Sequence, residues 1–274
     1  MPPRCLAWNR NRHVSVRVAA NARRYSFLLF ASILALHVTH AAVCDPEVFH
    51  GAYGLSLTGN TTIGGTTRPV AVVGRLVLDD SENLSGISSA SFTGLIFGNR
   101  VTGKYEAQRD CSVTWTLQDD SGNLQHFAGT MSADGRHVAF RQTDPGGAEN
   151  GNLLRTMEGC SESSLAGKFK LTVSGRTVDV NTAVDSGRVS FWGLLGADGS
   201  GNLSLASGPD EPAVVAGTYD VLDDCFVELV LQLPPGEHET AALHFRAILV
   251  ENGREVLGIQ TDPGTIVALR LVSR

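Results

Sequence analysis

The sequence has little positive charge beyond its first 25 residues, and this shortage narrows the range of possible partners. The chain of 274 residues contains 22 basic and 28 acidic residues. Six of the basic residues are arginines near the start, namely Arg4, Arg10, Arg12, Arg17, Arg23 and Arg24. The rest of the chain holds 16 basic against 28 acidic residues, a net charge near −12. Such acidity argues against nucleic acid or an anionic membrane as a partner.

The sequence also lacks the motifs of the common catalytic and cofactor sites. It contains no Gly-x-Ser-x-Gly, His-Glu-x-x-His, phosphate-loop or dinucleotide-binding pattern. Its cysteines and histidines form no Cys-x-x-Cys pair and no cluster of the kind that binds zinc. We therefore expect no metal and no cofactor, and we favour a non-enzymatic protein over an enzyme.

One long apolar run is present, and it lies near the start of the chain. Phe27–Val38 follows the arginine-rich head and is itself followed by the small residues Ala41 and Ala42. This order predicts a secretory signal peptide over residues 1–42, with a retained membrane anchor as the alternative. No later run approaches the roughly 18 apolar residues of a membrane-spanning helix. We therefore expect a secreted or periplasmic protein with no stable membrane insertion after signal removal.

The chain after residue 42 consists of two copies of one unit. Gly135–Gly146 reads GRHVAFRQTDPG and Gly253–Gly264 reads GREVLGIQTDPG, so eight of twelve positions agree. Other segments match in the same register. We divide the chain into a first repeat over 43–157 and a second over 158–274. A period near 115 residues is far too long for a solenoid, so each copy is expected to be a domain.

Four cysteines remain after the signal peptide, which contains the fifth, Cys5. An even number of cysteines in an exported chain indicates disulfides, and four cysteines allow three pairings. A duplicated unit should be self-contained. The repeat therefore favours one bond between Cys44 and Cys111 and another between Cys160 and Cys225.

Alternation of apolar and polar residues predicts an all-β fold. In Cys111–Gln118, for example, every second residue is apolar or a cysteine. Turn-forming pairs such as Asp134-Gly135 recur every 8–12 residues, a spacing typical of barrels and sandwiches. The first repeat gives eight candidate strands, near 50–58, 68–79, 83–94, 98–109, 111–119, 123–131, 136–143 and 150–157. We predict two tandem eight-stranded antiparallel up-and-down barrels, with two β-sandwiches as the alternative.

Two short motifs add a resemblance to a known class. Gly51-Ala52-Tyr53 and Gly167-Lys168-Phe169 resemble the Gly-x-Trp that begins the first strand of lipocalins. Thr143-Asp144 and Thr261-Asp262 resemble the late Thr-Asp signature, although here Pro-Gly follows each pair. Each repeat is thus similar to a calycin-type barrel of the lipocalin and avidin class, and to uncharacterised secreted bacterial proteins. The resemblance implies a barrel and specifies no ligand.

Four polar residues are predicted to point into the barrels. Tyr105, Tyr219, Gln142 and Gln260 each lie an even number of residues from apolar residues of the same expected strand. We call this shared strand parity, and it places their side chains on the same face as the apolar ones. A buried amide needs hydrogen-bond partners, so each Gln should either bond to the Tyr of its barrel or meet a ligand. These four residues are our candidate ligand-binding residues.

Two other repeated features have simpler interpretations. Each Thr-Asp-Pro-Gly should form a turn in which the Asp side chain caps its own turn. His126 and His244 precede core phenylalanines and should therefore lie on the surface.

The function expected from the sequence is binding of a small, largely apolar molecule in one or both barrels, without catalysis. The alternatives are a structural or surface-interaction protein with packed barrels and, less favoured, an enzyme of the cyclase or isomerase kind. The protein partner, if any, is unknown.

Overall fold

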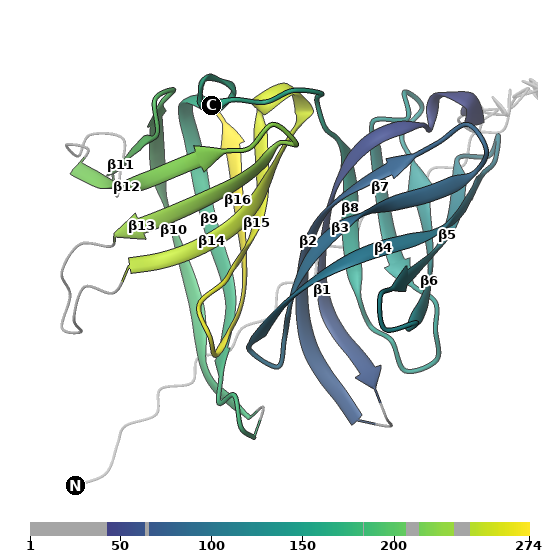
Figure 1. Ribbon diagram of the computed structural model, residues 1–274, viewed down its shortest axis with the longest axis horizontal. Coiled ribbons are helices and arrows are strands. Elements are labelled where there is room, and N and C mark those ends of the chain that lie inside the picture. Colours follow the sequence, from purple (N-terminus) through teal and green to yellow (C-terminus); the bar gives the residue numbers. More distant parts are fainter. Residues whose placement is uncertain (1–42, 64–65, 183, 207–213, 233–241) are drawn as a thin grey trace, which may run out of the picture. The chain divides into compact units, whose positions relative to one another are not determined.

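A computed structural model describes residues 43–63, 66–182, 184–206, 214–232 and 242–274 (Figure 1). The expected signal peptide over residues 1–42 lies outside the described residues. No helix in the described part of the chain has the length and apolar character needed to cross a membrane.

Barrel 1 is a closed meander of eight antiparallel strands, coloured purple to teal in Figure 1. Each strand pairs with the next one along the chain, and β8 pairs back with β1 to close the barrel. The strands are β1 (Gly51–Ile63), β2 (Thr66–Leu78), β3 (Asn83–Phe92), β4 (Leu95–Ala107), β5 (Ser112–Asp119), β6 (Leu124–Met131), β7 (His137–Gln142) and β8 (Asn150–Arg155).

Barrel 2 has the same topology and closes where β16 pairs with β9. Its strands are β9 (Ala166–Val178), β10 (Asp185–Asp198), β11 (Asn202–Ala206), β12 (Val214–Val221), β13 (Phe226–Gln232), β14 (Ala242–Val250), β15 (Glu255–Gln260) and β16 (Thr265–Ser273). The all-β prediction of two eight-stranded barrels is confirmed. The sandwich alternative is wrong, because closure leaves neither sheet with an open edge.

Alternating side chains fill each barrel. In β5, Val113, Trp115 and Leu117 are buried while Thr114 is exposed, as the period of two requires. In β13 the equivalent inward positions are Val227, Leu229 and Leu231.

One disulfide closes each repeat. Cys44 is bonded to Cys111 and Cys160 to Cys225, which confirms the predicted pairing. Both bonds join the segment before the first strand of a barrel to the start of its fifth strand. Such bonds are typical of proteins that fold outside the cytoplasm.

The two ends of barrel 1 are built differently. At the end that carries Cys44, the short 3₁₀ helix η1 (Pro46–Val48) leads into Phe49, which is buried. The ring of Phe49 packs against those of Tyr53 and Tyr105, at centroid distances of 5.2 and 5.4 Å. This aromatic plug fills that end. The opposite end carries the β1–β2, β3–β4, β5–β6 and β7–β8 connections, and we call it the mouth.

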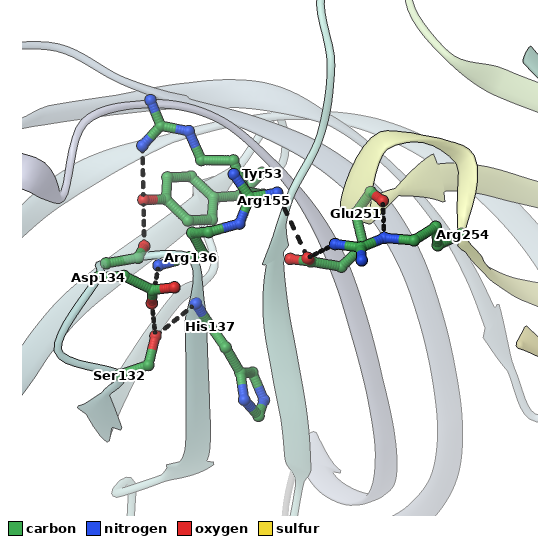
Figure 2. Close-up of polar contacts among 9 residues, drawn as sticks. Tyr53, Ser132, Asp134, Arg136, His137, Arg155, Glu251 and Arg254 are labelled. Atoms are coloured by element: carbon green, nitrogen blue, oxygen red, sulfur yellow. Dashed lines mark hydrogen bonds and ion pairs between the residues drawn. The ribbon is translucent and has the colours of Figure 1, made fainter. Parts of the chain in front are cut away.

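Backbone and side-chain hydrogen bonds join the two barrels. The Gly264 amide donates to the Gly94 carbonyl at 2.8 Å, and the Thr156 hydroxyl donates to the Leu249 carbonyl at 2.7 Å. Near the aromatic plug, the Arg136 guanidinium lies 3.3 Å from the carboxylate of Glu251, which belongs to the 3₁₀ helix η3 (Glu251–Gly253) of the second repeat (Figure 2).

Candidate functional site

A cavity of about 560 Å³ lies inside barrel 1 toward the mouth. Half of its lining is apolar, from Leu55, Leu57, Val70, Val72, Ala90, Phe92, Phe97, Val101, Leu117, Leu124 and Phe127. The polar half comprises Thr61, Thr62, Ser88, Asn99, Asp119, Ser121, Asn123, Gln125, Gln142, Asp144 and Glu149. Its size falls within the roughly 300–1,000 Å³ typical of small-molecule sites.

The floor of the cavity rests on an aromatic cluster. Phe127 lines the cavity and stacks on Trp115 at a centroid distance of 5.5 Å. Phe140 meets both rings edge-on, at 4.7 Å from Trp115 and 5.5 Å from Phe127. Rings held in this way give the cavity a rigid apolar base.

Glu149 is the buried carboxyl group in the cavity wall. It directly precedes β8, and only 2 % of its surface is exposed. The backbone approaches closely here, because a Cβ atom on Gly59 of β1 would lie 2.7 Å from the Glu149 Cα. The absence of a side chain at Gly59 thus lets the chain before β8 continue along β1 and turn Glu149 inward.

Neutral hydrogen-bond donors hold the Glu149 carboxyl, and the negative charge of Asp144 also acts on it. The side-chain amide of Gln125 donates to both carboxyl oxygens at 3.3 Å, and the Thr61 hydroxyl adds a further hydrogen bond. Burial, together with the nearby negative charge of Asp144, outweighs these bonds and raises the pKa of Glu149 to about 7. This carboxyl group can therefore gain or lose a proton near neutral pH.

Gln142 joins this polar side of the cavity to a surface network. Its Nε2 atom donates to Asp144 at 3.2 Å, while its buried Oε1 atom has no hydrogen-bond partner among the described residues. Asp144 also accepts from the His126 ring at 2.7 Å and from the His126 backbone amide at 2.8 Å. Burial alone would raise the pKa of Asp144, but these three hydrogen bonds together hold it below its usual value.

This network corrects one detail of the sequence interpretation. The Thr-Asp-Pro-Gly segments do turn, with Gly146 and Gly264 at φ values of 79° and 77°. The Asp side chain, however, reaches the neighbouring strand instead of capping its own turn. Asp262 contacts His244 with the same geometry, at 2.7 Å to the ring. Each His is about half exposed, as predicted, and ties the turn to the barrel wall.

The predicted pairing of Tyr with Gln is not formed among the described residues. The Tyr105 hydroxyl belongs to the plug and donates to the Asp79 carbonyl at 2.7 Å. Burial first, then nearby carboxylates, raise the pKa of Tyr105 to about 12. In barrel 2 the Tyr219 hydroxyl lies 3.0 Å from the Leu165 carbonyl, and Gln260 donates to Asp262. Of the two candidates in barrel 1, Gln142 lines the cavity.

Barrel 2 carries apolar residues where barrel 1 has its buried polar pair. Gly175 of β9 corresponds to Gly59, and a Cβ atom there would lie 2.6 Å from the Val267 Cα. Val267 thus occupies the place of Glu149. The residue before His244 is Leu243, whereas the residue before His126 is Gln125. The Glu149–Gln125 pair is therefore specific to barrel 1.

Sequence reasoning missed Glu149 and Gln125. A usable pattern existed for both. Gln125 shares strand parity with Phe127, and Glu149 shares it with Leu153. Two polar residues at inward positions of one copy, with apolar residues in the other copy, would have pointed to a site in barrel 1.

A scan against models of protein families found no match, and a search of the curated proteins found no similar sequence. The interpretation of the site therefore depends on its own geometry and chemistry.

Proposed function

We propose that the protein is an exported, calycin-like binding protein that holds a small, largely apolar molecule in barrel 1. The observation that carries this proposal is the cavity of about 560 Å³, which has an apolar floor and polar groups toward the mouth. Small-molecule sites combine apolar walls, which supply affinity, with a few polar groups, which fix orientation. The two disulfides support export.

Glu149 favours a second candidate function, an isomerase or cyclase that acts on the bound molecule. A buried carboxyl group with a pKa of about 7 is suited to proton transfer at neutral pH. In this case Glu149 would take a proton from one position of the substrate and return it to another. Conversion of a bound molecule by the wild type, but not by Glu149→Gln, would favour the enzyme over the carrier.

Native mass spectrometry of protein purified from its own host tests the binding proposal. We expect a small molecule to co-purify with the wild type. Ala90→Trp should abolish this binding, because the indole would fill the cavity that Ala90 lines. Ile87→Trp places the same ring on the exposed side of the same strand and serves as the matched control.

Circular dichroism should show that both variants fold, and the milder Val72→Phe provides a second way to narrow the cavity. The proposal fails if the wild type carries no molecule and binds no apolar probe. It also fails if Ala90→Trp and Val72→Phe, when folded, bind as well as Ile87→Trp.

A further inference from the structure

If barrel 1 holds an apolar molecule, as proposed above, the charges of its lining select the end group of that molecule. Three carboxyl groups line the cavity, those of Asp119, Asp144 and Glu149. None of the described lining residues is Lys, Arg or His. The lining thus carries carboxyl groups without a basic side chain among them, and His126 contacts Asp144 from outside the lining.

The three carboxyl groups differ in how they are bound. Asp119 lies at the mouth and accepts hydrogen bonds from Asn123 at 2.9 Å, which fix the β5–β6 turn. Asp144 is held by His126. Among the described residues, Glu149 accepts hydrogen bonds from the neutral side chains of Gln125 and Thr61, and no cationic side chain acts on it. Glu149 is therefore the group that a positive charge on a ligand would satisfy.

We propose that barrel 1 selects amphipathic cations of the alkylamine type over carboxylates of the same chain length. The alkyl part would lie on Leu55, Leu57 and Phe127, and the ammonium group would lie beside Glu149, nearer the mouth. A carboxylate in the same place would meet like charge in a poorly hydrated space, where repulsion is strong. An ammonium group near the mouth would keep part of its hydration while it neutralises the buried carboxylate.

The binding of an amine should increase as the pH rises from 6 to 8. Burial raises the pKa of Glu149 to about 7, so its carboxyl group is mostly neutral at pH 6 and mostly ionised at pH 8. An alkylamine stays protonated throughout this range. Gln125 from β6 and Thr61 from β1 face Glu149 and carry no charge, whereas Asp144 after β7 adds a negative charge and is itself paired with His126. The variant Glu149→Gln separates the effect of Glu149 from theirs.

Isothermal titration calorimetry with decylamine, decanol and decanoate tests this selection at pH 6 and pH 8. We expect decylamine to bind at least about tenfold more tightly than decanoate at pH 8, with decanol between them. Glu149→Gln should bring decylamine to within about twofold of decanol and remove the pH effect. Glu106→Gln removes one negative charge from the outer face of β4 and should change neither result.

The outcomes separate this selection from the binding function on which it depends. Decanoate binding as tightly as decylamine would overturn the selection and leave the binding function intact. The same holds if Glu149→Gln keeps the wild-type preference for the amine. Failure of all three probes to bind would contradict the binding function itself, and the selection with it.

Discussion

Barrels 1 and 2 have the same strand order, the same disulfide and the same contact between a His and the Asp of the Thr-Asp-Pro-Gly turn. They differ at inward positions: barrel 1 has Glu149 and Gln125 where barrel 2 has Val267 and Leu243. The shared features build the scaffold, and the differing features line its interior. Duplication has therefore preserved the parts that fold the barrel while the interior of each copy changed separately.

The disulfides test whether the scaffolds are equivalent, and their removal should have the largest effect. The bonded cysteines are 67 residues apart in barrel 1 and 65 in barrel 2. Loop entropy then predicts a loss of about 4 kcal/mol for either double Cys→Ala variant. Urea unfolding of the two variants provides the measurement. A much larger loss in one barrel would show that the copies depend on their disulfides unequally.

Val267→Glu tests whether barrel 2 tolerates the carboxyl group of barrel 1. Val267 is fully buried, so an ionised carboxyl there should destabilise the protein by about 3 kcal/mol or more at pH 8. Adding Leu243→Gln should recover part of the loss, because it supplies the amide donor that Glu149 has in Gln125. Urea midpoints of the single and double variants decide the matter, and absence of any recovery would contradict the proposed correspondence.

Glu149→Gln tests whether the buried carboxyl group of barrel 1, which barrel 2 lacks, makes stability depend on pH. Because the folded state raises the pKa of Glu149 from 4.5 to about 7, it binds a proton more tightly than the unfolded state does. Stability should therefore fall as the pH rises through this window, by up to about 3 kcal/mol. The variant should lack this fall. Between pH 5 and pH 8 the wild type should therefore lose stability relative to the Glu149→Gln variant. Equal pH profiles would show that Glu149 is not desolvated.

Tyr53→Phe should have the smallest effect. It gives barrel 1 the residue type that barrel 2 has at the equivalent position, Phe169. The Tyr53 hydroxyl donates to the Gly135 carbonyl at 2.6 Å and accepts from Arg155 at 3.2 Å (Figure 2). Removing it leaves a buried carbonyl without that donor, which should cost about 1 kcal/mol. Phe169→Leu would be a poor control because it also removes volume, so the effect is best compared with Thr114→Val on the exposed face of β5. Thermal unfolding measures both.

Much of the fold could be predicted because both copies of the repeat show the same alternation of apolar and polar residues, interrupted by turn-forming pairs. Alternation in Cys111–Gln118 and turns such as Asp134-Gly135 gave all eight strands of the first repeat, although some bounds differ by a few residues. The self-contained repeat was enough to choose one disulfide pairing of three. Parity also placed Tyr105 and Gln142 inward.

The site could be predicted only in part, because parity gives the direction of a side chain and not its height along the barrel. Tyr105 and Gln142 both point inward, yet Tyr105 lies in the plug and Gln142 near the mouth. Glu149 lies in a Gly-Gly-Ala-Glu-Asn segment that has the composition of a loop. Its burial depends on the close approach at Gly59, a pairing between the first and last strands that no local pattern reveals.

The position of the disulfides also determines how each barrel would respond to mechanical force. Tension that enters at Cys44 passes through the bond to Cys111 and bypasses β1–β4, so only the chain from β5 to β8 can be pulled out. Because β1 and β8 are antiparallel neighbours, a pull on the two ends of the repeat opens their hydrogen bonds one after another. Single-molecule extension should therefore give short steps of about 150 Å per barrel at low force, and reduction of the disulfides should more than double them.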